Sequence, residues 1–297
     1  AGKAMWSGID DKETPKAIQA AFDAGITTFD SAEVYGNGHS ERLLGQALAG
    51  VRDKVVIATK VFSNHLARKQ LVTACERSLR NLGTDYIDLY QIHWPPGSFG
   101  APAVPLEEPL DALMALKEQG KIRAIGVSNF DRGLLEKARA HAPVESLQPP
   151  YSLFWRSMEE ETLGWCREQN IITLAYSPMA QGILTGKFGP DPKFGKGDHR
   201  KGNRLFQPDI YPIVLDALER LRPIAAAHDL TLAQLALAWV IAQPGTCAIA
   251  GARNVDQAVA NAAAMAVDLD ADTLAEMDAI GRTVTDKLDD NPVQWQW

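Results

Sequence analysis

Four polar residues stand at or just beyond the ends of strand-like runs: Asp30, Tyr35, Lys60 and His93. Three of them end runs rich in β-branched or aromatic residues, and Tyr35 follows Asp30 by five positions. The strands of a parallel barrel all end at one face, and that face carries the active site. A carboxylate, a phenol, an amine and an imidazole gathered there could deliver a proton to a carbonyl oxygen.

Reduction of a carbonyl needs a hydride on carbon and a proton on oxygen. The ordinary pKa of tyrosine is about 10, so we expect a neighbouring cation to lower the pKa of Tyr35. Lys60 is the candidate cation, Asp30 could hold its ammonium, and His93 could orient the carbonyl. Each also has an ordinary explanation, as a loop cap, a loop tyrosine, a paired lysine or a structural histidine. The four together are far more specific than any one of them.

The surrounding sequence predicts alternating helices and strands. Thr14 and Pro15 are typical of an N-cap and a first-turn proline, and Gly25 is typical of a helix end. The predicted strands are residues 26–29, 55–59, 86–92, 124–128, 146–148, 171–176 and 247–250. After the helix that begins at Thr14, the predicted helices are residues 40–48, 71–82, 106–119, 133–140, 159–169 and 231–242.

Seven helix–strand pairs without an obvious linker predict one domain over residues 1–297, an α/β protein with a (β/α)8 TIM barrel. No GxGxxG motif follows a predicted strand, so a Rossmann domain is not expected. Gly36 and Gly38 match its first two glycines, but the third glycine is absent from the required position. Only about a dozen residues precede the first helix, too few to show the eighth strand. The first strand is therefore expected to be missing or truncated, since an open barrel leaves costly unpaired edges; unusual closure is the alternative.

Two long segments interrupt the alternation. Residues 94–105 follow His93 and contain four prolines and two glycines. Residues 179–209 follow the strand predicted at 171–176 and are rich in glycine, proline and basic residues. Long loops at the carboxyl ends of barrel strands usually carry substrate and cofactor contacts.

Composition argues against several classes of protein. The net charge of −7 does not suit a dedicated nucleic-acid binder, which needs clustered Lys and Arg. Cys75, Cys166 and Cys247 lie far apart in apolar stretches, so we expect three reduced, buried thiols and no metal site. No run approaches the roughly 20 apolar residues of a membrane span, and the N-terminus lacks a secretory apolar region. These features predict a cytoplasmic protein that does not bind membranes.

The chain resembles the aldo-keto reductase superfamily over nearly its whole length. The resemblance rests on GITTFDSAEVYG at 25–36, ATK at 58–60, DYIDLYQIHW at 85–94, IRAIGVSNF at 122–130, LQPPY at 147–151, AYSPMAQG at 175–182 and AGAR at 250–253. It looks most similar to a bacterial branch that also resembles the β-subunits of voltage-gated potassium channels. The resemblance implies a (β/α)8 barrel that binds NADP(H) without a Rossmann domain, and it implies the same four residues as catalytic tetrad, with Tyr35 as general acid.

The same resemblance implies where NADP(H) binds. Ser128, Asn129 and Gln148 would hold the nicotinamide carboxamide, and Tyr176 would lie under the nicotinamide ring. The pyrophosphate loop and adenosine end would comprise Ser177, Pro178, Met179, Gln181, Gly182, Leu184, Lys187, Arg204, Gly251, Arg253, Gln257 and Asn261.

Physical chemistry supports part of this assignment. Gly182 and Gly186 permit close approach of the backbone to phosphate, and a helix that begins after Arg253 would offer free N–H groups. The planar guanidinium of Arg253 suits a 2′-phosphate, although a solvated surface arginine is the alternative. Arg204 is a weaker candidate, because its basic, glycine-rich stretch could simply be mobile.

The substrate is expected to be a small carbonyl compound. Trp6, Trp94, Phe99 and Trp155 could line an apolar pocket mouth over Tyr35 and would suit an aromatic or aliphatic aldehyde. Packing beneath a loop is the alternative for each ring. The C-terminal residues 291–297, with two tryptophans, are expected to fold back on the barrel.

The leading interpretation is an NADPH-dependent reductase of aldehydes and ketones, monomeric as is usual for the family. A cofactor-binding regulatory subunit that senses redox state and turns over slowly is a second interpretation, which the potassium-channel resemblance allows. A structural barrel without a cofactor does not explain Ser128, Asn129 and Gln148 at consecutive strand ends.

Overall fold

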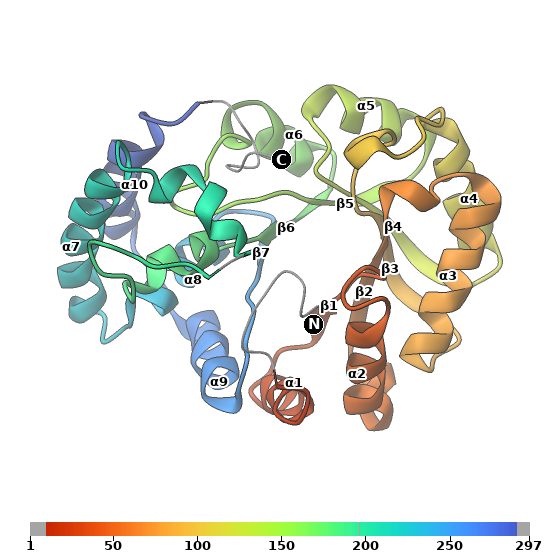
Figure 1. The fold of residues 1–297 in the computed structure, drawn as a ribbon, viewed down its shortest axis with the longest axis horizontal. Coiled ribbons are helices and arrows are strands. Elements are labelled where there is room, and N and C mark those ends of the chain that lie inside the picture. The colour runs from red at the N-terminus through yellow and green to blue at the C-terminus, as the bar shows by residue number, and fades with distance from the viewer. Residues whose placement is uncertain (1–9, 196, 290–297) are drawn as a thin grey trace. The chain divides into compact units, whose positions relative to one another are not determined.

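The computed structural model describes residues 10–195 and 197–289 (Figure 1). The strands are β1 (Thr28–Asp30), β2 (Val56–Val61), β3 (Ile87–Ile92), β4 (Ile122–Ser128), β5 (Val144–Gln148), β6 (Ile172–Tyr176) and β7 (Thr246–Ile249). The helices are α1 (Thr14–Asp23), α2 (His39–Leu48), α3 (Arg68–Leu82), α4 (Glu107–Glu118), α5 (Arg132–His141), α6 (Gly164–Glu168), α7 (Tyr211–Ala227), α8 (Leu232–Ile241), α9 (Val255–Ala263) and α10 (Ala271–Thr285).

The chain forms two compact units. The first comprises the described part of Ala1–Gln148 together with Glu168–Ile172 and Ala252–Val259. The second comprises Pro149–Arg167, Thr173–Gly251 and the described part of Ala260–Trp297. The borders fall within α6, β6 and α9, so each unit contains parts of these elements.

The first unit is a parallel sheet in which β1 to β5 pair in chain order. Every residue of β3 is buried, as expected for a parallel strand covered on both faces. Helices α2, α3, α4 and α5 follow one another along one side of these strands (Figure 1). A Cβ on Gly45 would lie 2.1 Å from the carbonyl oxygen of Leu82, so only glycine allows α2 and α3 to pack this closely.

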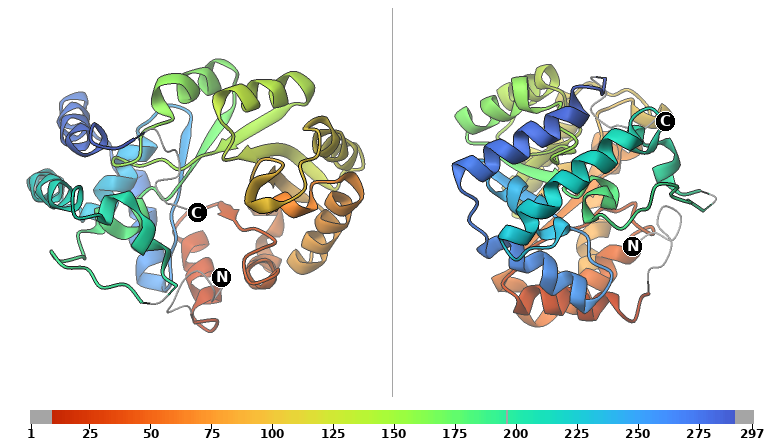
Figure 2. Two further views of the ribbon diagram at one scale, coloured as in Figure 1. Left: turned by 45° about the horizontal axis from the view of Figure 1, so that its top comes forward. Right: turned by 90° about the vertical axis from the view of Figure 1, so that its left-hand side faces the viewer.

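The second unit contains β6 and β7 as parallel neighbours, from the pair Thr173–Thr246 to the pair Tyr176–Ile249. Helices α7 and α10 lie side by side (Figure 2). Their buried faces contribute to an apolar core that includes Trp239 from α8. Thr231 and Gln234 form a capping box that begins α8, where each side chain satisfies a backbone N–H of the helix end.

All seven predicted strands are present, with ends shifted by at most two residues, but several details of the prediction were wrong. Glu13, not Thr14, is the N-cap of α1: the Thr14 amide already donates to the Asp10 carbonyl, so the chain turns one residue earlier. The helix predicted at 159–169 is divided into a π-helical turn, Glu159–Leu163, and α6. Helices α7 and α10 were not predicted.

The cysteine prediction holds for Cys75 and Cys166, which are buried, but not for Cys247, which is exposed. Cys247 lies on β7, whose one strand partner among the described residues is β6. An apolar strand sequence therefore did not guarantee burial on both faces.

The eighth barrel strand, predicted ahead of the first helix, would lie before Asp10 and thus outside the described residues. Trp6 and the C-terminal segment 291–297 also lie outside them. In the described part of the chain, no single helix is both long and apolar enough to cross a membrane; α7 and α8 pass that test only as a pair, bent by 84°.

Candidate active site

Lys60 is completely buried near the end of β2 and has two acceptors. Its Nζ donates to Oδ1 of Asp30, the last residue of the neighbouring strand β1, and to the carbonyl oxygen of Ser31 at 2.8 Å. Parallel pairing of β1 with β2 opposes Asp30 to Ala58, which brings the two strand ends together. A buried ammonium is tolerable only with such partners, so the Asp30–Lys60 pair is an obligatory unit.

The second oxygen of Asp30 is occupied by side-chain amides. Oδ2 accepts a 3.0 Å hydrogen bond from Nε2 of Gln148 and a longer one, 3.4 Å, from Nε2 of Gln91. Gln91 is completely buried on β3 and was not predicted as a site residue. A side-chain amide within a buried strand, two residues before His93, was the available signal.

Tyr35 and His93 lie next to this pair. The Nζ of Lys60 is 5.5 Å from the centre of the Tyr35 ring. The rings of Tyr35 and His93 meet edge to face, with their centres 5.8 Å apart. The structure thus brings together the four predicted residues Asp30, Tyr35, Lys60 and His93 near the carboxyl ends of β1, β2 and β3.

Burial determines the protonation of the two rings. It raises the pKa of the Tyr35 phenol; the Lys60 cation opposes this effect and the Asp30 carboxylate adds to it. The net pKa of Tyr35 is therefore raised, not lowered as expected from the sequence. Burial, reinforced by Lys60, lowers the pKa of His93 well below its ordinary value, so its imidazole is neutral near pH 7.

Aromatic rings extend from His93 along the loops that follow β2 and β3. The Phe62 ring lies edge to face with His93 at 5.6 Å and stacks on Phe99 at 5.5 Å. Phe99 in turn meets Trp94 at 5.0 Å. Phe62 was not predicted; its position two residues after Lys60 was the only signal in the sequence.

The carboxyl ends of β4 and β5 carry linked polar groups. Ser128 Oγ donates to the carbonyl oxygen of Gln148 at 2.8 Å. Asn129 adopts a left-handed backbone conformation, with φ of 59°, and its amide donates to the His93 carbonyl oxygen at 3.0 Å. These bonds fix Ser128 and Asn129 beside His93.

Arg253 and Gln257 also belong to the first unit. Both are exposed, and the backbone N–H of Arg253 donates to Oε1 of Gln257 at 2.9 Å. Helix α9 begins at Val255, so a helix begins after Arg253 as predicted.

In the second unit, Tyr176 ends β6 and the loop that follows is strongly curved. Ser177, Gln181 and Gly182 have positive φ angles of 54°, 57° and 93°. Oε1 of Gln181 is buried without a hydrogen-bond partner among the described residues. A Cβ on Gly182 would lie 3.1 Å from Nζ of Lys187, so this ammonium lies directly against the glycine backbone.

The other predicted site residues of the second unit differ in their burial and in their partners. Leu184 is buried, and Pro178 and Met179 lie between Ser177 and the 3-10 turn Ala180–Thr185. Asn261 donates to the exposed Gly251 carbonyl at 3.2 Å, and Arg204 pairs with Asp209 at 3.0 Å. Trp155 is completely buried with its ring 6.2 Å from that of Tyr176, which favours the packing alternative.

The basic, glycine-rich stretch before Arg204 is organised by aromatic packing. The ring of Phe206 contacts those of Phe188 and Phe194, with centres 5.2 and 4.6 Å apart. The Arg200 guanidinium lies 4.9 Å from the Phe194 ring. Phe188 and Phe206 also pack against the apolar core of the second unit, so these contacts attach Phe194 and Arg200 to that core.

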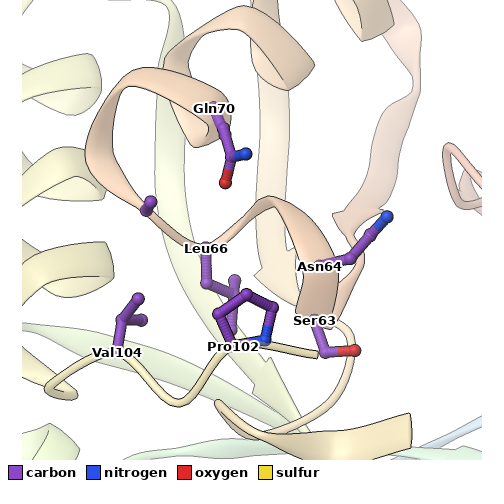
Figure 3. A pocket seen from close by; sticks show the side chains of 7 residues that line it. Ser63, Asn64, Leu66, Gln70, Pro102 and Val104 are labelled. Atoms are coloured by element: carbon purple, nitrogen blue, oxygen red, sulfur yellow. The ribbon is translucent and has the colours of Figure 1, made fainter. Parts of the chain in front are cut away.

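A cavity of about 270 Å³ lies next to the loop after β2 (Figure 3). Leu66, Ala67, Pro102 and Val104 form its apolar wall, and Ser63 contributes a polar edge. The four candidate catalytic residues do not line it. Among the described residues, no group of three or more His, Cys, Asp or Glu side chains could hold a metal ion.

Comparison with known proteins gives consistent matches. The model of the Aldo/keto reductase family matches residues 2–282. The chain is 40% identical to aldo-keto reductase YhdN of Bacillus subtilis over 268 residues, covering 86% of this chain and 80% of that protein. Both matches span most of the chain.

Solved structures show the same relationship. A glycerol dehydrogenase from Gluconobacter oxydans matches with a TM-score of 0.87 and 34% identity, over 96% of this chain and 90% of that one. An aldo-keto reductase from Klebsiella pneumoniae in complex with NADPH matches with a TM-score of 0.76 and 32% identity, over 97% and 89%. These matches confirm the predicted (β/α)8 barrel fold class, of which the described residues contain seven strands.

Proposed function

The chain belongs to the aldo/keto reductase family, and on that premise we propose that it reduces aldehydes or ketones to alcohols with NADPH, with Tyr35 as the proton donor. The observation that carries the proposal is the buried Lys60, held by Asp30 beside the Tyr35 ring. A structural role alone does not require a buried ammonium next to a tyrosine and a neutral histidine.

Each residue of this group has a distinct part in the proposed reaction. Neutral His93 donates a hydrogen bond from a ring nitrogen to the carbonyl oxygen and orients it. Tyr35 transfers its phenolic proton to the same oxygen, and the Lys60 ammonium stabilises the phenolate that remains. Asp30 holds that ammonium in place. NADPH, when bound, supplies the hydride that the carbonyl carbon receives.

The described residues are suited to holding NADP(H). In the first unit, Ser128, Asn129 and Gln148 present amide and hydroxyl groups of the kind that a carboxamide requires, and Arg253 with Gln257 offers an exposed cation at the start of α9. Gln148 would have to bind the carboxamide through its side-chain oxygen or release Asp30, because its Nε2 already donates a hydrogen bond to Asp30.

In the second unit, we assign the pyrophosphate to the curved loop from Ser177 to Lys187. The Gln181 side chain, whose Oε1 has no partner among the described residues and whose NH2 group can donate to an anion, lies in this loop with the left-handed Gly182. The Lys187 ammonium lies against Gly182, and an extra Cβ on residue 182 would crowd that cation. Tyr176 supplies an aromatic ring at the start of this loop.

We also propose that residues 1–297 form a single barrel domain, that the protein acts as a monomer, and that it works in the cytoplasm. The proposed substrates are small aromatic or aliphatic aldehydes, because Phe62, Phe99 and Trp94 form an apolar aromatic surface next to His93. Light scattering of the purified protein tests the oligomeric state.

The direct test is loss of NADPH absorbance with an activated aromatic aldehyde, for the wild type, Tyr35→Phe and Tyr86→Phe. Tyr35→Phe should bind NADPH normally but reduce the aldehyde at least about 100-fold more slowly, because general acid catalysis is removed. Tyr86→Phe is the control, since its ring lies between Arg52 and Arg123, away from this group, and these contacts need no hydroxyl. If Tyr35→Phe reduces the aldehyde at the wild-type rate, Tyr35 is not the acid. If the wild type binds NADPH but does not turn over, the regulatory-subunit interpretation is favoured.

A further inference from the structure

Glu33 is a buried carboxylate between Asp30 and Tyr35 that has no part in the reaction proposed above. Its side chain is 3% exposed. Oε1 accepts a 2.7 Å hydrogen bond from the backbone N–H of Phe62 and lies 2.9 Å from Nδ1 of His65. Oε2 accepts a hydrogen bond from Nη2 of Arg77. A carboxylate can satisfy all three neighbours at once, because it is an acceptor at both oxygens.

The backbone of Glu33 is fixed at the same point. Its N–H donates to the carbonyl oxygen of Lys60 at 3.2 Å, and its carbonyl oxygen accepts the N–H of Gly38 at 2.8 Å. Glu33 thus joins the loop that carries Tyr35 to the end of β2 that carries Lys60. It joins the same loop to Phe62, whose ring contacts His93.

A second buried carboxylate binds the other end of β2 in a similar way. Asp88 accepts the N–H of Ile57 at 3.0 Å and pairs with Arg52 at 2.7 Å and Arg123 at 3.0 Å. Ile57 is the second residue of β2, whereas Phe62 directly follows its last residue. Both carboxylates are buried and both bind a backbone N–H and arginine, but only Glu33 is at the catalytic end.

We propose that Glu33 is a positioning residue, which holds the Tyr35 loop against the end of β2 so that Tyr35, Lys60 and His93 keep their mutual distances. This inference rests on the proposed reductase function. Hydrogen bonds to a charged acceptor are about twice as strong as neutral ones, so a carboxylate is well suited to fix two loop segments. A displacement of about 1 Å among reacting groups can cost on the order of 100-fold in rate.

The experiment compares Glu33→Ala with Asp88→Ala, and Glu33→Gln with Asp88→Asn. In each comparison both substitutions remove or neutralise a buried carboxylate that binds arginine and a backbone N–H, of Phe62 just after β2 or of Ile57 within it. We therefore expect comparable losses of stability, whereas only the Glu33 variants affect the catalytic end of the strand. Thermal unfolding checks that the variants are folded. If an alanine variant does not fold, Glu33→Gln and Asp88→Asn decide instead. In Glu33→Gln the amide oxygen can still accept the N–H of Phe62, whereas the NH2 group is a donor and cannot accept from Arg77.

Two readouts are required. Hydrogen–deuterium exchange should accelerate in residues 32–40 and 61–66 for the Glu33 variants, and near Ile57 for the Asp88 variants. The kcat for aldehyde reduction should fall by about 10-fold to 100-fold in Glu33→Ala and remain within about 3-fold of wild type in Asp88→Ala. The dissociation constant of NADPH should change by less than about 2-fold in all variants, since none of these residues is assigned to the cofactor.

The outcomes separate the two proposals. Equal kcat losses in the matched variants, or unchanged exchange in residues 32–40, would overturn the positioning role. Absence of turnover in the wild type would remove the reductase proposal instead, and hydrogen exchange would still show whether Glu33 holds the Tyr35 loop.

Discussion

The side-chain amide of Gln148 donates a 3.0 Å hydrogen bond to Oδ2 of Asp30, across 118 positions of sequence. Because Lys60 occupies Oδ1, both oxygens of the carboxylate are engaged. Asp30 therefore does more than neutralise a lysine: it links the ends of β1, β2 and β5. Loss of Asp30 would therefore release Lys60 and the Gln148 amide together.

Replacement of Asp30 by alanine should destabilise the protein by about 3–5 kcal/mol, because a completely buried ammonium would lose its counter-charge. Urea unfolding near neutral pH measures the change. Glu136→Ala is the control, since the Arg132–Glu136 pair is exposed and should contribute less than about 1 kcal/mol. Similar losses in both variants would mean that Lys60 does not depend on Asp30.

Tyr35 should remain a proton donor well into the alkaline range. Its phenol must be protonated to donate, and burial raises its pKa above the ordinary value of about 10. The kcat for aldehyde reduction should thus be flat from neutral pH to about pH 10 and fall above it. Steady-state rates across this range, with circular dichroism to confirm folding, test the expectation. A decline centred near pH 8 would show that the Lys60 cation outweighs burial.

His93 should make stability fall on acidification. Its folded-state pKa lies well below 6.5, so below about pH 6.5 the unfolded chain binds a proton that the folded protein does not. The free energy of unfolding should then drop by about 1.4 kcal/mol for each pH unit below 6.5, as long as His93 stays neutral. Urea titrations of the wild type and His93→Gln between pH 7.5 and 5.5 isolate this contribution. Parallel pH dependences in the two proteins would contradict a neutral, buried His93.

Arg253→Ala should weaken NADPH binding far more than NADH binding, if the exposed guanidinium contacts the 2′-phosphate. A loss of about 10-fold to 100-fold in NADPH affinity corresponds to one charge-assisted contact of roughly 1.5–3 kcal/mol. Fluorescence titration with each cofactor measures the two constants. Arg132→Ala, another arginine on the surface of the first unit, is the control. Equal effects on NADPH and NADH would show that Arg253 does not distinguish them.

The strands were predictable because their signals are local. A run of β-branched and apolar residues followed by a polar residue marks the end of a buried strand, and β1, β2 and β3 place Asp30, Lys60 and His93 at or near such ends. Helix α7 was missed because Pro223 lies inside its pattern and a long irregular segment precedes it. Cys247 was misjudged because burial depends on what packs against β7, which its own sequence does not state.

The identity and order of the strand-end residues, and the family that they indicate, were determined by sequence alone, since periodicity and short motifs are properties of neighbouring positions. Only the tertiary structure decided that Gln148 and Gln91 bind Asp30, that Glu33 binds Phe62, and that burial outweighs Lys60 in setting the pKa of Tyr35. These are contacts between residues distant in sequence and effects of solvent exclusion. Both arise only when strands and loops have packed together, so no local pattern encodes them.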